Sequence, residues 1–272
     1  MTARTLALVF LLFAFSAGAF AAEPEKNEVL NNGQDITRPL ARFDARYQYQ
    51  LLPGGRAKNT VTVRTDRPFV INEHWGIGTR VDLPAVFSNK VTADEPHGAF
   101  KGGLGDLLGE IVLIRKFNEL WAAGAGTQFI FPTAGTDQLG DGKYQLLPTV
   151  GIRRQLPGVS NGSFAGFVMR YAVNYAGSEK RPSISTLEMA PTFNWILPDN
   201  WFFTAYPSTD IQINLQKGGA VFLPFDIMIG KTIPKRAVFS VELGFPMYHH
   251  GAVADFYTSY DFKAEARVGI FY

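Results

Sequence analysis

The ten residues "KAEARVGIFY", Lys263 to Tyr272, alternate strictly between apolar and polar side chains. Starting one residue earlier, one face of this stretch is apolar and consists of Phe262, Ala264, Ala266, Val268, Ile270 and Tyr272. The opposite face carries Lys263, Glu265 and Arg267. Successive side chains of a β-strand point to opposite sides, so this pattern predicts a strand with one apolar and one charged surface. We expect this strand to pair along both of its edges.

The same alternation recurs along the chain in segments of about ten residues, the length of a membrane-crossing strand, although the more apolar segments at residues 106–117 and 120–132 alternate poorly. In residues 41–51, for example, Phe43 and Tyr47 oppose Arg42, Asp44 and Arg46. Further strands are predicted at residues 59–65, 74–84, 106–117, 120–132, 143–156, 162–176, 185–197, 200–215, 220–233 and 237–247. Together with residues 262–272 these segments predict about twelve strands, an even number as expected for a bacterial membrane barrel.

Two classes of protein share this alternation, namely a soluble β-sandwich and an outer-membrane barrel. Charged residues make up only 18% of the chain and aromatic residues 14%. No run of about 18 apolar residues follows residue 22, so no membrane helix is expected. An open sheet edge in lipid leaves backbone groups without partners, so a last strand that pairs with the first favours a closed barrel. The predicted fold class is therefore all-β, a transmembrane antiparallel β-barrel in the outer membrane of a Gram-negative bacterium.

The chain divides into three parts. Residues 1–21 read as a signal peptide, with Arg4, an apolar stretch at residues 6–15 and the A-x-A site that ends at Ala21. Residues 22–39 are predicted to form a short periplasmic segment and residues 40–272 the barrel. The chain contains no cysteine, which argues against a lipoprotein anchor and a disulfide framework. Short connections are predicted at one end, such as residues 198–200 and 234–236, and longer loops at the other end.

The polar faces of the predicted strands should line the lumen. The candidate lumen and constriction residues are Arg42, Asp44, Arg46, Arg80, Asp82, Arg170, Glu188, Asp210, Glu242, Lys263, Glu265 and Arg267, with Glu110 and Asp226 beside them. At the closing seam we predict salt bridges between the charged rows of the first and last strands. Such a network either selects permeants or simply fills and rigidifies the barrel, and we favour the second interpretation. Because both signs of charge are present, we expect only a weak ion preference.

Three prolines interrupt predicted strands, namely Pro191, Pro207 and Pro224. Proline cannot donate to the hydrogen-bond ladder, so each one predicts a bulge, a kink or a local break. A kink that opens a lateral exit into lipid is the functional alternative to a purely structural bulge.

Several motifs resemble one bacterial outer-membrane family. They are Gly103-Leu104-Gly105-Asp106, Phe131-Pro132-Thr133 and Gly140-Asp141-Gly142-Lys143, together with "FDARYQYQLLPGG" and the terminal "DFKAEARVGIFY". The chain resembles, over nearly all of its mature length, the family named for the phenol-degradation meta-pathway, which is distantly similar to FadL-type channels. The resemblance implies a barrel that passively conducts small hydrophobic or aromatic compounds. The segment before the first strand is shorter than a FadL-type plug, although a short inserted segment remains open.

The resemblance and the pattern also predict partners. The apolar positions Val268, Ile270 and Tyr272 are typical of the signal that the barrel-assembly machinery recognises. The expected partners are outer-membrane lipids, this machinery and a small permeant. The net charge of +2 gives no indication of nucleic-acid binding. No cofactor and no metal are expected, and the oligomeric state is left open.

Two alternatives to a channel remain, a hydrolase and a structural barrel with a filled lumen. A Ser-His-acid site would need His249 or His250 to meet Ser259 and an acid, Asp255 or Asp261, but no lipase motif is present. The histidine pair could also bind a metal if it lay in an outer loop, where the sequence analysis places it. Carboxylates in residues 92–100 and 135–142 could bind calcium, although solvated loops are the simpler interpretation. We expect no enzymatic activity.

Overall fold

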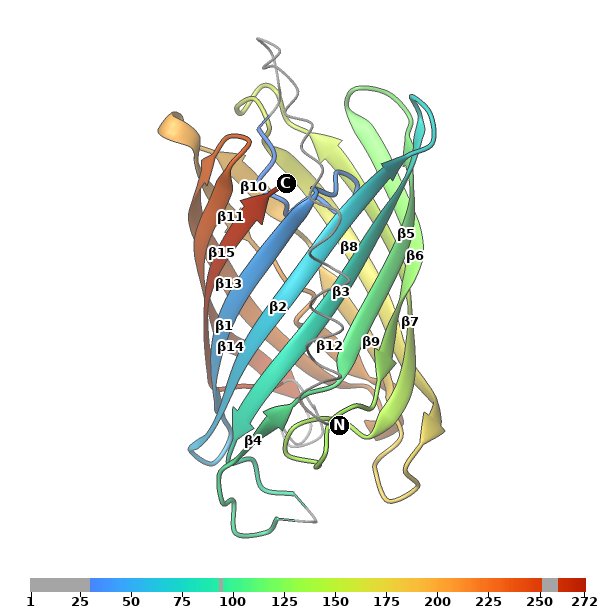
Figure 1. The fold of residues 1–272 in the computed structure, drawn as a ribbon, viewed down its shortest axis with the longest axis vertical. Helices are drawn as coiled ribbons and strands as arrows, with labels where there is room; N and C mark the ends of the chain where they lie inside the picture. Colours follow the sequence, from blue (N-terminus) through green and yellow to red (C-terminus); the bar gives the residue numbers. More distant parts are fainter. Residues whose placement is uncertain (1–29, 93–94, 251–258) are drawn as a thin grey trace.

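The computed structural model describes residues 30–92, 95–250 and 259–272, and in this part of the chain twelve antiparallel strands close into a barrel (Figure 1). The predicted fold class and the strand number are therefore confirmed. Among the described residues, no helix is long and apolar enough to span a membrane.

Of the described barrel strands, ten are continuous and two consist of two segments each. The segments are β1 (Arg42–Leu52), β2 (Arg56–Val70), β3 (Trp75–Ser88), β4 (Lys101–Leu104), β5 (Leu107–Lys116), β6 (Trp121–Phe131), β7 (Lys143–Gln155), β8 (Phe164–Gly177), β9 (Ser185–Ala190), β10 (Phe193–Ile196), β11 (Trp201–Ala205), β12 (Ile211–Asn214), β13 (Ala220–Ile233), β14 (Ala237–His250) and β15 (Phe262–Phe271). Two short 3₁₀ turns, η1 (Pro198–Asn200) and η2 (Leu215–Lys217), lie in connections. β4 is a short extension that pairs only with β3.

The last strand closes the barrel against the first. β15 pairs antiparallel with β1 from Phe271 opposite Arg42 to Phe262 opposite Leu51. The other edge of β15 pairs with β14, so both edges of the terminal strand are satisfied. Every other barrel strand pairs with its neighbours in chain order, which is the simplest antiparallel meander.

The two faces of the wall differ sharply. On β15, Val268 and Ile270 are 43% and 59% exposed on the outside, whereas Lys263 and Arg267 on the opposite face are 1% and 2% exposed. The same alternation runs along β7 and β13, where every second residue is buried. An apolar outside and a charged inside is the arrangement of a barrel that crosses a membrane, since a soluble domain would reverse it.

The prolines interrupt the wall as predicted. Pro191 lies between β9 and β10, and Pro207 lies between β11 and β12. Pro224 lies at a register shift between β13 and β14. Each break or bulge is the expected consequence of a residue that lacks an N–H donor.

Some predicted boundaries were wrong. β2 runs from Arg56 to Val70, so most of the gap left between the predicted strands at residues 59–65 and 74–84 is strand. β14 continues to His250, which places His249 and His250 on a strand and not in a loop. Neighbouring side chains on a strand point to opposite sides, so the two imidazoles do not form the loop metal site that the sequence analysis considered.

The segment before β1 lies inside the mouth of the barrel. Figure 1 shows it at the end where β1 begins and β15 finishes. Its residues contact inward-facing side chains from several strands, including Asn194 and Arg153. Residues 30–39, assigned from sequence to a short periplasmic segment, thus form an inserted segment. The predicted signal peptide, residues 1–21, lies outside the described residues.

Candidate functional site

The charged faces of β1 and β15 meet at the closing seam. Arg46 bonds Asp44 on its own strand at 2.8 Å and Glu265 on β15 at 3.4 Å. Arg42 lies 2.7 Å from Asp66 on β2 and 3.4 Å from Asp44. Opposite charges within 4 Å compensate each other's loss of hydration, which is large for buried ions. Among the described residues one ion pair, Arg46 with Glu265, therefore crosses the seam, and the other pairs lie within β1 or join it to β2.

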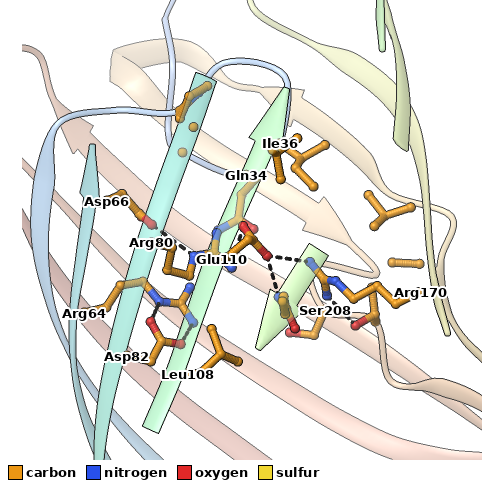
Figure 2. A pocket seen from close by; sticks show the side chains of 18 of the residues that line it. Gln34, Ile36, Arg64, Asp66, Arg80, Asp82, Leu108, Glu110, Arg170 and Ser208 are labelled. Carbon is orange, nitrogen blue, oxygen red and sulfur yellow. Dashed lines mark hydrogen bonds and ion pairs between the residues drawn. The ribbon is translucent and has the colours of Figure 1, made fainter. Parts of the chain in front are cut away.

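The ion pairs continue across β2, β3 and β5, as Figure 2 shows. Arg64 binds both oxygens of Asp82, at 2.6 and 2.5 Å. Arg80 lies 3.0 Å from Asp66 and 3.7 Å from Glu110. Two parallel N–H donors of a guanidinium match two carboxylate oxygens, so such pairs hold their geometry firmly.

Glu110 connects this row to the far side of the lumen. It accepts a hydrogen bond from Gln128 at 2.5 Å and lies 3.5 Å from Arg170 on β8. Arg170 donates in turn to Thr209 at 2.8 Å. We call this continuous set the arginine belt, and its members are Arg42, Asp44, Arg46, Arg64, Asp66, Arg80, Asp82, Glu110, Gln128, Arg170 and Glu265.

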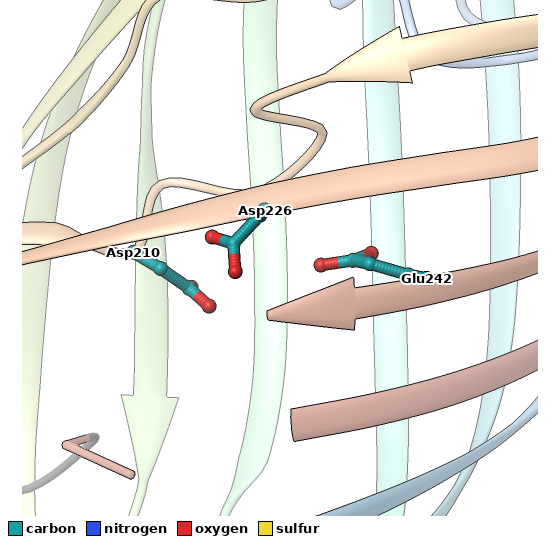
Figure 3. A group of neighbouring side chains, drawn as sticks. All are labelled: Asp210, Asp226 and Glu242. Carbon is teal, nitrogen blue, oxygen red and sulfur yellow. The ribbon is translucent and has the colours of Figure 1, made fainter. Parts of the chain in front are cut away.

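A second cluster surrounds Lys263 on β15. Its ammonium lies 2.5 Å from Asp210, 2.6 Å from Glu242 and 3.5 Å from Asp226. Tyr260 donates to Asp226 at 2.6 Å. Figure 3 shows the three carboxylates converging, Asp226 from β13, Glu242 from β14 and Asp210 from the connection between β11 and β12, and their oxygens lie within 4.8 Å of one another. Three carboxylates at this spacing could ligate a metal, but Lys263 already supplies a cation to all three. We call this the lysine cluster.

Residues 206–210, between β11 and β12, fold into the lumen and touch both groups. Thr209 accepts from Arg170 of the arginine belt, while Ser208 donates to Glu242 at 3.2 Å. Asp210 belongs to the lysine cluster. We call residues 206–210 the inward segment. It leaves the wall at Pro207, where the strand ladder cannot continue.

The inserted segment, residues 30–39, is tied to the wall by its own polar contacts. Asn32 donates to Asn194 at 2.7 Å, and its carbonyl accepts from Arg267 at 3.1 Å. Asp35 pairs with Arg153 at 3.1 Å, and both side chains are buried. These contacts join the segment to β7, β10 and β15, so it narrows the mouth from several sides.

A cavity of about 340 Å³ lies between the two narrowings. Residues 33–36 of the inserted segment bound one side and residues 207–210 of the inward segment bound another. The rest of the lining comes from members of the arginine belt, from Glu188, Ala190 and Thr192 beside the broken strands, and from apolar side chains that include Leu108, Val112, Ile130, Leu147 and Val168. The cavity thus has both charged and apolar walls and is large enough for several waters or one small organic molecule.

Three of the motifs that carry the family resemblance, at residues 103–106, 131–133 and 140–143, meet at the end with the longer loops. Asp106 accepts the backbone N–H groups of Ala134 and Asp141 at 3.0 and 2.7 Å. Thr133 donates to the carbonyl of Gly105 at 2.7 Å. Burial raises the pKa of Asp106, and the two N–H donors oppose that shift. These three motifs therefore hold residues 105–107 against residues 132–142 and stabilise the loop rather than line the lumen.

The predicted lumen residues all lie on inward positions, and the exposed fractions of the buried ones run from 0% for Asp226 to 9% for Glu110. Whether they form a constriction that selects permeants stays a prediction. Sequence reasoning placed Arg64 on the polar face of residues 59–65 without naming it as a lumen candidate, and it missed Asp66, which one further step of the same alternation would have found. It also missed Tyr260 and the polar contacts of the inserted segment, which no periodic pattern marks.

The residues of the hydrolase alternative differ in their exposure. His249 and His250 are exposed at the end of β14, while Ser259 is 4% exposed. Asp255 lies outside the described residues. The alternative therefore stays an untested prediction.

Comparisons with solved structures place this geometry among known barrels. The chain is similar to the COG4313 outer-membrane channel of Pseudomonas putida F1, with 13% identity and a TM-score of 0.65 over 92% of this chain and all of that one. It is also similar to the NanC porin, with 9% identity and a TM-score of 0.55 over 85% of this chain and 98% of that one. At these identities the likeness shows the fold, which is that of an outer-membrane barrel. No protein-family model and no curated protein matches the chain, so membership of the phenol-degradation family stays a prediction.

Proposed function

We propose that this protein is a passive outer-membrane channel for small organic compounds. The observation that carries the proposal is the charged cavity of about 340 Å³ inside a closed barrel with an apolar outer wall. Solutes would move down their gradient, and the inserted and inward segments would limit their size. The likeness to solved channels supports the passive mode.

The charge of the lumen bears on the permeant. Five arginines line the cavity, and each lies within 4 Å of a carboxylate or donates to the inward segment. Paired charges of both signs create little net field, so we expect weak ion selectivity. Hydrophobic or aromatic compounds, which the family resemblance implies, would pass best if they carry one polar group for these side chains.

A second route for the permeant leads sideways through the wall into lipid. One observation favours it, the position of the break in the strands of the wall. Ala190 and Thr192 lie beside Pro191, and the inward segment leaves the wall opposite them. These residues also line the cavity, so the interior reaches the break. An apolar compound that entered the cavity would leave through the wall into lipid without passing the inserted segment.

Single-channel conductance of the refolded mature protein in planar bilayers tests the main proposal. We expect small open steps that phenol or toluene blocks in a concentration-dependent manner, and a fatty acid serves as the longer apolar probe. Block by toluene and the fatty acid but not by phenol would favour the lateral route. A folded barrel without any conductance would contradict the channel and favour the structural alternative.

A cross-link tests whether the inserted segment narrows the path. The chain has no cysteine, so Asn32→Cys with Asn194→Cys introduces a unique pair at two side chains 2.7 Å apart. We expect oxidation of this pair to suppress open steps and reduction to restore them. Asn32→Cys alone is the matched control. Equal conductance before and after reduction would show that the segment does not control the path.

Assembly is a separate part of the proposal. Val268, Ile270 and Tyr272 all face outward, with Tyr272 51% exposed. These side chains are accessible before the barrel enters lipid, as recognition by the assembly machinery would require. That role stays a prediction. A Tyr272→Ser variant that assembles at the normal rate in cells would contradict it.

A further inference from the structure

The outer wall carries a repeated cross-strand pair at the end with the short turns. Trp75 on β3 lies directly opposite Arg115 on β5, and the guanidinium is 5.1 Å from the indole centre. Trp121 on β6 lies opposite Arg154 on β7 at 5.5 Å. Trp201 on β11 lies opposite Lys231 on β13 at 5.3 Å. Three of the four tryptophans of the chain take part. We call these the rim pairs.

The rim pairs lie at one level of the barrel. Trp75, Trp121 and Trp201 are each the first residue of their strand after a short turn. Because all three strands start at the same end, the three indoles form part of one ring around the wall. Arg67 adds a related contact on β2, where it lies 5.5 Å from the ring of Phe69.

The rim pairs border the apolar wall. Trp121 and Trp201 are 38% and 43% exposed. Along β5, Ile111 and Leu113 share the outward face with Arg115, and they are 45% and 44% exposed. Going toward the turns, the outward face of β5 therefore changes from apolar side chains to a level at which a cation and an aromatic ring lie side by side on neighbouring strands. This arrangement of side chains matches the depth profile of a membrane interface, where tryptophan is enriched.

The rim cations differ from the arginines of the lumen in their partners. Arg42, Arg64 and Arg80 are all paired with carboxylates. Among the described residues, no side-chain hydrogen bond or ion pair involves Arg115, Arg154 or Lys231. A ring covers the flat face of a guanidinium and leaves its N–H edge open to an acceptor. These cations are therefore positioned for an acceptor that the protein does not supply.

We propose that the rim pairs bind the headgroup phosphates of anionic phospholipids. A phosphate offers several oxygens to an N–H edge, and the lipid chains would lie along the apolar wall below. The inference rests on the proposed outer-membrane location and places the short-turn end in the phospholipid leaflet. It is independent of the permeant, because every residue involved points away from the lumen.

Tryptophan quenching by brominated lipid tests this inference on the full protein. The barrel is refolded in phosphatidylcholine vesicles that contain a minor fraction of phosphatidylglycerol, with bromine on one lipid or the other. We expect phosphatidylglycerol to associate about fivefold more strongly than phosphatidylcholine at low salt, the effect of one nearby basic residue. High salt should reduce this preference, since exposed charges are screened.

A triple variant, Arg115→Gln, Arg154→Gln and Lys231→Gln, retains all three tryptophans as reporters. We expect its preference for phosphatidylglycerol to fall to about one, because neutral amides lack the charge that draws phosphate. Lys116→Gln is the matched control, since Lys116 lies at the same end but is already paired with Glu119 at 2.8 Å. The preference should survive in this control.

Three results would overturn the inference. Equal quenching by both lipids in the unchanged protein at low salt would do so without any variant. An unchanged preference in the triple variant would show that other groups bind the lipid. Stronger association with lipid A than with phosphatidylglycerol would place this end in the other leaflet. Conductance of the triple variant, measured in parallel, is expected to stay normal and separates this question from the channel.

Discussion

The two halves of the barrel wall carry their buried charges differently. From β1 to β8 the strands are continuous, and the arginine belt alternates acids and bases so that most charges have two partners. From β9 to β15 prolines interrupt two strands, and Lys263 alone faces three carboxylates. When one charge of the first half is lost, most of its partners keep a second ion pair. In the second half, the three carboxylates depend on a single cation.

The largest effect is expected from Lys263→Met. The substitution leaves Asp210, Asp226 and Glu242 buried close together without a cation. Removing one partner of a buried ion pair costs about 3–5 kcal/mol, because the remaining charge loses its compensation. The free energy of unfolding, from guanidinium titration in lipid vesicles, measures this loss.

Adding Asp226→Asn to that variant is the matched control. The neutral amide removes one of the uncompensated charges, so we expect the double variant to regain part of the lost stability. A single variant as stable as the unchanged protein would mean that the carboxylates become protonated at little cost. The contrast between the two halves would then disappear.

A smaller loss is expected from Glu110→Gln in the arginine belt. Arg80 keeps Asp66, and Arg170 keeps Thr209, so neither cation is left alone. We expect about 1–3 kcal/mol, the cost of one weakened charged hydrogen bond. The same variant removes one negative charge from the cavity lining, so reversal potentials in a salt gradient should move toward anions. A loss as large as that of Lys263→Met would show that the belt does not share its charges.

The prolines can be tested through conductance rather than stability. Pro207→Ala restores an N–H donor where the inward segment leaves the wall. The stability change should stay within about 1 kcal/mol, the usual effect of replacing a proline. We expect higher single-channel conductance, because part of the inward segment can rejoin the ladder. Pro224→Ala is the control, since β13 and β14 remain paired on both sides of that bulge. Equal conductance in both variants would show that Pro207 does not hold the segment inward.

The fold could be predicted from the sequence because one pattern, the alternation of apolar and polar residues, determines it. The alternation of residues 262–272 and of most of the other segments fixes both faces of those strands, and closure follows from the cost of an open edge in lipid. The lumen residues followed from the same pattern, as Arg42 and Lys263 show. The inserted and inward segments did not, because both depend on single contacts between distant residues. Asn32 and Asn194 are 162 positions apart, and no local signal connects them.

The smallest effect is expected at the surface, from Glu119→Gln in the turn between β5 and β6. Lys116 donates to Glu119 at 2.8 Å, and this hydrogen bond, with the positive charge, lowers the pKa of Glu119. A lowered carboxyl pKa contributes stability above the unfolded pKa, about 4.3, and that contribution is lost as the pH falls through the folded value. Glu119 is largely exposed, so water and salt screen the pair. The unfolding midpoints of the variant and the unchanged protein should therefore coincide at pH 3 and, in 0.15 M salt, at pH 7 as well. A difference at pH 7 in that salt, comparable to the loss in Glu110→Gln, would show that exposed pairs at this end stabilise the barrel as much as buried ones do.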